Sequence, residues 1–508
     1  MARIAIVKLF TGLNLAPAQL SAELKRAGHA TRVIYFKDYE SRDITEIDDY
    51  KITDHPGIMI LINKKGQSKK VWNCYREFTE TEYQLLINEL REFGAEAIAF
   101  CVHSGIIDET AQVSRRLKQE LGLPVLWGGA GPTLQPERCI AHTDLLCIGE
   151  GEEVIVEAAN KIDQQQNLDG IEGTWFKTDN GEINKYGKRA LGSLDDIAIP
   201  NWVTEDYVHI NDDQITHNIY PPNLGTEYSI MTQRGCPFSC SFCIESKYQE
   251  MFGKKNSLRR RDPQLVIDEL KWAKENLGIK TVWFWDDVFT VHPRWLDEFL
   301  PLYKQEINLP FWCYTYPTTH NPELLRKLRL AGCSSLTMGV QSGSQRVLSE
   351  HFNRPTKTDR VIEAAEEILE AGIDGNFDLI TKNHVETEED LQETFEFLMR
   401  FPQKMKYFGF MEMMSFPTFD YTEEVDSLIA SDQKLPNASL SEDDYAYYHK
   451  LFHLTRTEMP REQIRAIAED PKFRKNHDLM NVHLDRGDLL KQIVEWRNLA
   501  PLTENAFH

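Results

Sequence analysis

The chain has 508 residues, 41% hydrophobic and 27% charged, which at roughly 100–200 residues per domain predicts about three domains. These ordinary fractions exclude the disordered, collagenous and low-complexity classes. The chain has 57 lysines and arginines against 79 aspartates and glutamates, and the resulting net charge of −22 repels phosphate backbones and anionic lipid. The composition therefore argues against a general nucleic-acid binder or membrane binder.

Two further features concern the cellular compartment. No apolar run approaches the roughly 18–20 residues of a membrane helix, and the N-terminus lacks a signal-peptide cleavage pattern. Nine cysteines, an odd number, suit a reducing compartment better than a disulfide framework. We therefore expect a cytoplasmic protein without a membrane partner.

Strand and helix signals alternate over residues 1–165. The expected strands lie at 3–9, 31–36, 97–102, 125–127 and 145–148, and the expected helices at 16–27, 79–93, 108–121 and 152–162. Apolar strands separated by helices are typical of a parallel sheet that is covered on both faces. The pattern predicts an α/β domain with a Rossmann-like, doubly wound parallel sheet.

Three loops of this domain follow expected strands, at the edge where parallel sheets bind ligands. The residues that we select from them as candidate ligand contacts are Ser104, Gly128, Gly129, Pro132, Thr133, Gly149 and Glu150. Each glycine taken alone can simply end a strand. The Gly-x-Gly-x-x-Gly fingerprint of dinucleotide binding is absent, so NAD or FAD is not expected here.

Residues 166–225 differ in character from the preceding domain. They contain a hairpin pattern with an Asn180-Gly181 turn and, further on, the pair Pro221-Pro222. We expect this segment to be a connector between two domains.

The most informative segment is the spacing Cys236-x3-Cys240-x2-Cys243, directly after an apolar run. Three thiolates on one short loop can converge on a single metal centre. A structural zinc site would need a fourth Cys or His nearby, and the next histidine is His292. A [4Fe–4S] cluster bound by only three cysteines leaves one iron open for a non-protein ligand.

This motif, with Phe242 before the last cysteine, resembles the signature of the radical SAM superfamily. The resemblance implies that Cys236, Cys240 and Cys243 bind a [4Fe–4S] cluster whose open iron holds S-adenosylmethionine (SAM). An electron from the cluster, supplied by a donor such as flavodoxin or ferredoxin, would cleave SAM to methionine and a 5′-deoxyadenosyl radical that acts on a small-molecule substrate. Phe242 would pack beside the adenine.

The sequence after the motif supports a (β/α)6 partial TIM barrel over residues 226–420, with six strand–helix units counted from Tyr228. Within the resemblance, Asp286 and Asp287 match the position that holds the SAM amino group. Gln341 and Ser342 match the position that reaches the ribose and carboxylate. Each of the four can also be a solvated strand end.

The two domains together resemble the cobalamin-binding radical SAM family over about residues 1–420. The resemblance implies a cobalamin against the three loops named above, here called the glycine loops, which contain Ser104, Gly128 to Thr133, and Gly149 with Glu150. The Asp-x-His-x-x-Gly motif of other cobalamin proteins is absent, as it generally is in this family. The chain departs from the family at Gln341, where glutamate is common, and at residues 380–390, which lack the usual Gly-x-Pro before a Glu-Thr pair.

Two charged or titratable groups of residues have less specific explanations. From 421 to 508 the chain is polar and helical, and we expect His449 and His453 to be a satisfied surface pair rather than metal ligands. The run Arg259-Arg260-Arg261 could hold an anionic substrate, but we expect a solvated face at a helix start.

Three functions remain open from the sequence. The first is a cobalamin-dependent radical SAM methyltransferase that methylates an unactivated carbon. The second is a radical SAM oxidation, cyclisation or rearrangement without methyl transfer. The third is a non-catalytic metal-binding or regulatory protein built on a degenerate barrel.

Overall fold

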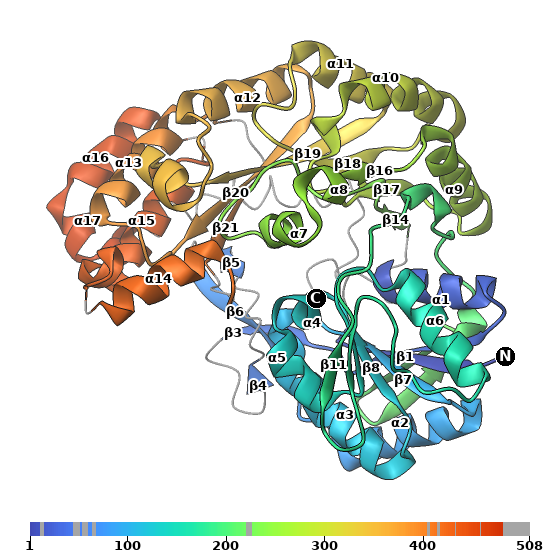
Figure 1. The fold of residues 1–508 in the computed structure, drawn as a ribbon. Helices are drawn as coiled ribbons and strands as arrows, with labels where there is room; N and C mark the ends of the chain where they lie inside the picture. Colours follow the sequence, from blue (N-terminus) through green and yellow to red (C-terminus); the bar gives the residue numbers. More distant parts are fainter. Residues whose placement is uncertain are drawn as a thin grey trace.

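The computed structural model describes residues 1–10, 15–43, 51–52, 59–62, 68–219, 226–403, 407–413, 417–431, 433–457 and 459–480. Its helices and strands form an N-terminal unit and a barrel-like unit that lie against each other (Figure 1). Within the described residues, no helix is both long enough and apolar enough to cross a bilayer.

The N-terminal unit is built on a nine-stranded sheet in the order β11-β10-β9-β8-β7-β1-β2-β12-β13. Its five central strands run parallel. They are β1 (Arg3–Leu9), β2 (Ala30–Phe36), β7 (Ala97–Cys101), β8 (Val125–Gly128) and β9 (Leu145–Cys147). The expected doubly wound parallel sheet is confirmed.

Helices cover both faces of this sheet, because its central strands are apolar on both sides. On one face lie α1 (Leu15–Arg26) and α6 (Glu152–Asp163), and on the other α2 (Glu80–Phe93) and α3 (Ile107–Leu121). Figure 1 shows α1 and α6 on the side that faces the barrel-like unit.

Residues 166–225 contribute strands to both edges of the sheet as well as linking the two units. The hairpin of β10 (Thr174–Lys177) and β11 (Ile183–Lys185) pairs with β9, and Gly181 occupies its turn with φ +87°. At the other edge, β12 (Tyr207–Asn211) runs parallel to β2 and pairs with β13 (Gln214–His217). The segment therefore belongs structurally to the N-terminal unit.

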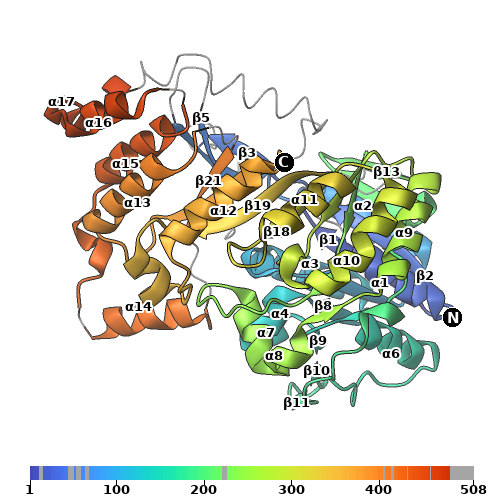
Figure 2. The ribbon, with the colours of Figure 1, turned by 90° about the horizontal axis from the view of Figure 1, so that it is seen from above.

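A small antiparallel sheet that the sequence did not predict branches from the N-terminal unit. It contains β3 (Glu40–Asp43), β4 (Lys51–Ile52), β5 (Met59–Ile62) and β6 (Ser68–Tyr75). Its strand β5 contacts β21 of the second unit, and the two lie side by side in Figures 1 and 2.

The second unit is a six-stranded, all-parallel sheet in chain order, which confirms the (β/α)6 prediction. Its strands are β14 (Glu227–Ile230), β17 (Thr281–Phe284), β18 (Phe311–Thr315), β19 (Cys333–Gln341), β20 (Asp374–Thr381) and β21 (Tyr407–Glu412). The outer helices are α9 (Pro263–Asn276), α10 (Pro293–Leu302), α11 (Pro322–Ala331), α12 (Thr358–Glu370) and α13 (Glu388–Arg400). They bury the outward side chains of the strands in one core.

Within the described part of the chain, four α-helices follow the barrel: α14 (Asp420–Ala430), α15 (Glu442–Leu454), α16 (Arg461–Glu469) and α17 (Pro471–Lys475). Helix α15 packs on α13 and joins the barrel core. His449 and His453 are therefore buried, and His449 Nε2 lies 3.1 Å from Thr381 Oγ1, so the expected surface pair is wrong. The last part of the expected helical segment, residues 481–508, lies outside the described residues.

A buried ion pair joins the end of β2 to α2. Lys37 Nζ donates to Glu82 Oε1 at 2.7 Å, and the two side chains are 2% and 0% exposed. We expect Glu82→Gln to lower the free energy of unfolding by about 3–5 kcal/mol, because it leaves a buried ammonium without a counter-charge. Thermal denaturation measures the effect.

The matched control is Glu80→Gln, in the first turn of the same helix. Glu80 is 62% exposed and pairs with Arg116 on the surface, so this change should cost less than about 1 kcal/mol. Equal shifts of the melting midpoint in the two variants would contradict a stabilising role of the buried Lys37–Glu82 ion pair.

Candidate functional site

The three cysteines lie on one loop between the end of β14 and helix α7 (Ile244–Phe252). Cys236 and Cys240 are buried, Cys243 is partly exposed and caps the N-terminus of α7, and none forms a disulfide. Gly235 precedes them with φ +87°, at a point where a Cβ would overlap the carbonyl of Ser257. Glycine is thus required for the chain to enter this loop.

Side chains from α7 and from the segment after β19 hold the loop in place. Gln249 Nε2 donates to Cys236 O at 2.5 Å and to Phe238 O at 2.8 Å. Arg354 Nη1 donates to Cys240 Sγ at 3.4 Å, and its Nη2 donates to Gly339 O at 2.7 Å. The arginine therefore links the cysteine loop to β19.

The donor set fits an iron–sulfur cluster better than a zinc ion. Among the described residues, no three or more His, Cys, Asp or Glu side chains surround one point where a single ion could bind. A cube places each thiolate on a different iron, so its ligands need not meet at one point. Burial raises the pKa of Cys236 to about 12 and raises that of Cys243 further, and a bound cationic metal centre would offset that penalty.

Asp286 and Asp287 follow β17 but have different surroundings. Asp286 is fully buried and accepts from Thr232 N at 2.6 Å, Gln233 N at 2.9 Å and Arg260 Nη2 at 3.0 Å. Its carboxylate oxygens are engaged by the segment that leads into the cysteine loop and by Arg260, and its contact to SAM stays a prediction. Asp286 therefore positions the loop.

Asp287 faces a cavity together with Glu245, the second residue after the last cysteine. Burial, and then the charge of Asp286, raises the pKa of Asp287 to about 6. Burial, and then the charge of Asp287, raises the pKa of Glu245 to about 8. Two carboxyl groups with raised pKa values in one cavity can accept and release protons near neutral pH.

The other expected SAM contacts lie where β19 ends and beside the cysteine loop. Phe242 packs edge-on against Phe352, with ring centroids 4.9 Å apart. Gln341 adopts φ +71°, strained for a non-glycine residue, and its buried Oε1 has no hydrogen-bond partner among the described residues. Ser342 Oγ accepts from Ser344 N at 3.1 Å and so shapes the turn.

The glycine loops of the N-terminal unit meet at Thr133. Its Oγ1 donates to Gly129 O at 2.8 Å and accepts from Gly149 N at 3.0 Å, so one hydroxyl joins the loops after β8 and β9. Gly129 has φ +115°, and a Cβ there would lie 2.6 Å from Val102 O. Pro132 is buried in the short helix α4 (Ala130–Leu134), which packs on the turn that begins at Ser104.

A cavity of about 480 Å³ lies between the two units, at the carboxyl edges of both parallel sheets. Of the expected site residues, it is lined by Gly128, Gly129, Gly149, Glu150 and Asp287. Its N-terminal wall is mostly apolar and continues between the sheet and helices α1 and α6, with Leu20, Leu126, Leu145, Val154 and Ile155. Its barrel wall is polar, with Arg234, Glu245, Tyr248, Arg259 and Asp287.

Ion pairs connect the two walls. Arg234 bonds to Glu150 at 3.1 Å and to Glu152 at 2.5 Å, and Arg259 also pairs with Glu150. Gly149 is close enough to the barrel unit that a Cβ would lie 2.6 Å from Phe252 Cζ of α7. Glu150 and Gly149, expected as ligand contacts, therefore also dock the two units.

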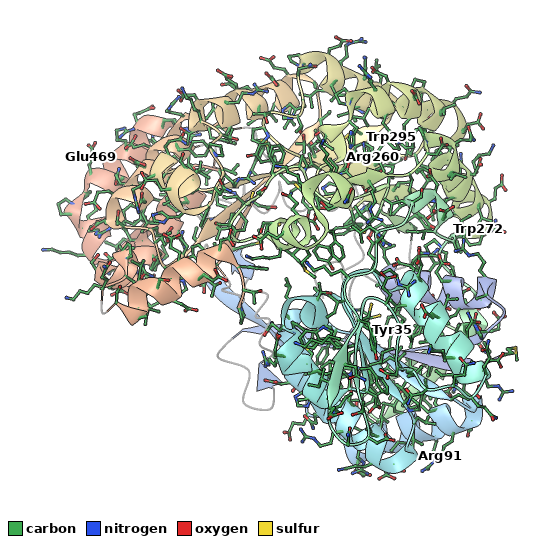
Figure 3. All side chains as sticks on the ribbon, in the orientation of Figure 1. Tyr35, Arg91, Arg260, Trp272, Trp295 and Glu469 are labelled. Carbon is green, nitrogen blue, oxygen red and sulfur yellow. The ribbon has the colours of Figure 1, made fainter. Side chains whose placement is uncertain are left out.

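The arginine run 259–261 is not the solvated face that the sequence led us to expect. Arg259 pairs with Glu150, Arg260 with Asp286 at 3.0 Å, and Arg261 with Glu269 at 2.6 Å. Arg260 also lies over the ring of Trp295, 4.3 Å from its centroid, and both residues are labelled in Figure 3. Three carboxylates on different elements draw the run inward.

Sequence analysis missed Arg234, Glu245, Tyr248 and Arg354. Three of them lie within twelve residues of a cluster cysteine, which is a signal that could have drawn attention to them. Arg354 is more than a hundred residues from Cys240 in the chain, and only the fold brings them together.

Comparisons with known proteins agree with this geometry. Residues 230–398 match the family model described as Radical SAM superfamily. An uncharacterized methyltransferase of Pyrococcus horikoshii is 27% identical over 278 residues, which cover 54% of this chain and 57% of that protein. The cytidylyl-2-hydroxyethylphosphonate methyltransferase of Streptomyces wedmorensis is 26% identical, over 54% of this chain and 55% of the relative.

A further relative is the anaerobic magnesium-protoporphyrin IX monomethyl ester cyclase of Rubrivivax gelatinosus, which is 24% identical over 60% of this chain and 53% of its own length. The chain thus spans about half the length of each of these curated relatives.

Two solved structures share the fold across both units. The radical SAM methyltransferase TsrM of Kitasatospora setae, with cobalamin and a [4Fe–4S] cluster bound, superposes with a TM-score of 0.64 at 17% identity, over 86% of this chain and 80% of that chain. The cobalamin-dependent radical enzyme OxsB, with aqua-cobalamin and SAM bound, gives 0.63 at 13% identity, over 98% of this chain and 75% of that chain.

The cysteine loop generates a prediction about the cluster. Cys236→Ala, Cys240→Ala and Cys243→Ala should each abolish the cluster and reductive SAM cleavage, and the triple variant should be no worse, because ligands that act as a unit are not additive. Iron and sulfide content and visible absorption after anaerobic reconstitution measure the effect.

Cys313→Ser and Cys333→Ser are the controls. These two thiols are fully buried in the barrel core, on neighbouring strands, and should not affect the cluster. The ligand assignment is overturned if Cys313→Ser loses the cluster while Cys240→Ser still cleaves SAM.

Proposed function

We propose that the protein is a cobalamin-dependent radical SAM methyltransferase, on the premise that residues 230–398 match the radical SAM superfamily. When bound, the [4Fe–4S] cluster would supply the electron that cleaves SAM to methionine and a 5′-deoxyadenosyl radical, and cobalamin would supply the methyl group. The acceptor would be an unactivated carbon of a small molecule. A one-electron protein such as flavodoxin or ferredoxin would reduce the enzyme.

The observation that carries the proposal is the cavity between the two units. Residues expected to contact cobalamin (Gly128, Gly129 and Gly149) and Asp287, beside the cysteine loop, line one continuous space. Methyl transfer from one cofactor to a substrate radical formed by another requires both reacting centres to share a site. A cavity enclosed at the edges of both sheets provides that arrangement.

The apolar branch of the cavity supports cobalamin in particular. Between the sheet and helices α1 and α6 the walls are aliphatic, with Leu126, Leu145 and Val154. Such walls suit the flat organic base of a cobalamin nucleotide tail better than a charged group. Gly128 and Gly129 let the backbone approach the ligand closely.

A second candidate function has its own support. The magnesium-protoporphyrin cyclases of Rubrivivax gelatinosus and Cereibacter sphaeroides are 24% and 26% identical to this chain over half of their lengths. A radical cyclisation or oxidation without methyl transfer would use the same cluster and SAM site. The non-catalytic alternative has no comparable support, because the cysteine loop retains all three thiols.

Product analysis separates the two reactions. With its substrate, a methyltransferase should form S-adenosylhomocysteine and 5′-deoxyadenosine together, because one SAM supplies the radical and another supplies the methyl group. Mass spectrometry of anaerobic turnovers measures both. Formation of 5′-deoxyadenosine without S-adenosylhomocysteine, alongside a modified product, would favour cyclisation or oxidation over methylation.

Gly129→Ala tests the cobalamin site. A Cβ there would lie 2.6 Å from Val102 O, so the loop must move, and we expect the reconstituted variant to retain at least about tenfold less cobalamin than the wild type. Corrinoid absorption after gel filtration measures retention.

Gly122→Ala is the control for backbone strain. Gly122 has a similarly positive φ of +66°, but it meets no atom within 4 Å and lies at the other end of the strands. The variant should lose about 1 kcal/mol of stability and keep its cobalamin. Wild-type protein that reconstitutes its cluster but never retains cobalamin would refute this part of the proposal.

A further inference from the structure

Two sets of side chains alternate along β17 and β18. One set, which includes Val282, Phe284 and Cys313, is buried against the outer helices. Because successive side chains of a strand point to opposite faces, the intervening residues face the inside of the barrel. On this face, Trp283 of β17, Trp285 directly after it, and Trp312 and Tyr314 of β18 are aromatic and partly exposed.

These four rings form a continuous aromatic wall. Trp312 is central, with ring centroids 5.4 Å from Trp283, 5.0 Å from Trp285 and 4.6 Å from Tyr314. The indole N–H of Trp285 donates to Ser229 Oγ at 3.0 Å, and that of Trp312 donates to Thr337 Oγ1 at 2.8 Å. These two hydrogen bonds hold the Trp285 and Trp312 rings in place.

An acidic side chain of the barrel interior lies on β20, the second strand along the sheet from β18. Asp378 lies on β20 and is in register with Gly339 of β19. It follows Asn376 by two residues, and Asn376 is in register with Thr337 of β19, which is in register with Tyr314 of β18. Burial raises the pKa of Asp378 to about 6, and the charge of Asp378 contributes to raising the pKa of Tyr314. The carboxyl group therefore lies near the aromatic wall.

No cation of the described chain neutralises this carboxyl group. The inward positions of β14, β17, β18, β19 and β20 include Glu227, Asp374 and Asp378 but no Lys, Arg or His. No ion pair to Asp378 forms among the described residues. Arg354 reaches this end of β19, but its guanidinium is engaged by Gly339 O and Cys240 Sγ.

Unpaired acceptors lie in the same interior. Asn376 Oδ1 and Glu227 Oε1 are buried and have no hydrogen-bond partner among the described residues. A ligand that brings N–H donors would satisfy such groups, whereas an anionic ligand would meet only further acceptors and like charge.

We propose that the barrel interior binds a cationic aromatic substrate, an aromatic amine or protonated nitrogen heterocycle. Its ring stacks on the wall formed by Trp283, Trp285, Trp312 and Tyr314, and its nitrogen donates to Asp378. Flat rings gain from offset stacking, and a cation gains from both the ring faces and the carboxylate. This substrate class rests on the proposed function, because the wall ends at Trp285, two residues before Asp287, which lines the cavity between the two units.

Three ligands that share one ring test the charge preference. Tryptamine is a cation, tryptophol is neutral and indole-3-acetate is an anion, and equilibrium dialysis against the anaerobically reconstituted full chain measures their affinities without turnover. We expect tryptamine to bind at least about tenfold more tightly than indole-3-acetate, with tryptophol between them.

Variants locate the binding site. Asp378→Asn should weaken tryptamine at least about tenfold and leave indole-3-acetate unchanged or tighter, and Asp378→Glu should restore the preference for the amine. The matched control Asp268→Asn removes a carboxylate from the exposed face of α9 and should change neither affinity. Thermal denaturation of each variant verifies folding.

Equal affinity for the amine and the acid, absence of tryptamine binding, or a preference that survives in Asp378→Asn would overturn the substrate class. Reductive cleavage of SAM by the same preparation is measured separately. If cleavage is intact and the amine preference is absent, only the substrate class fails. If the cluster or cleavage is absent, the proposed function itself fails.

Discussion

The ion pairs between the two units determine most of what the site can do. Arg234 and Arg259 from the barrel hold Glu150 and Glu152 at the edge of the N-terminal sheet, and Phe252 seats against Gly149. These contacts place the carboxyl edges of two parallel sheets opposite each other. Ligands of parallel sheets bind at that edge. The ion pairs and the Phe252 contact therefore combine the edges of the two sheets into one cavity.

A second set of contacts, within the barrel unit, buries charge near the cysteines. Asp286 is engaged by Arg260 and by backbone donors that lead into the cysteine loop, so it fixes the loop instead of meeting solvent. Asp287, one residue later, faces the cavity with its pKa raised. One carboxylate supports the loop, and its neighbour faces the cavity.

The barrel interior and the interdomain cavity have different chemistry. The N-terminal wall of the cavity is aliphatic around Leu126 and Leu145, whereas the barrel interior is aromatic and acidic around Trp312 and Asp378. Aliphatic walls select a flat neutral group by shape, and a ring wall with a carboxylate selects by charge as well. Under the two proposals, the cavity beside the N-terminal sheet would hold the cofactor and the barrel interior would hold the substrate.

The sequence by itself determined the elements whose signal is local. Apolar runs and helical periods predicted both parallel sheets, and the spacing of Cys236, Cys240 and Cys243 predicted the cluster loop, whose radical SAM resemblance the family match confirms. Only the tertiary structure decided which charges pair, as for Arg259 with Glu150, and that His449 is buried. Ion pairing and burial depend on residues more than sixty positions apart, whose proximity no local pattern encodes.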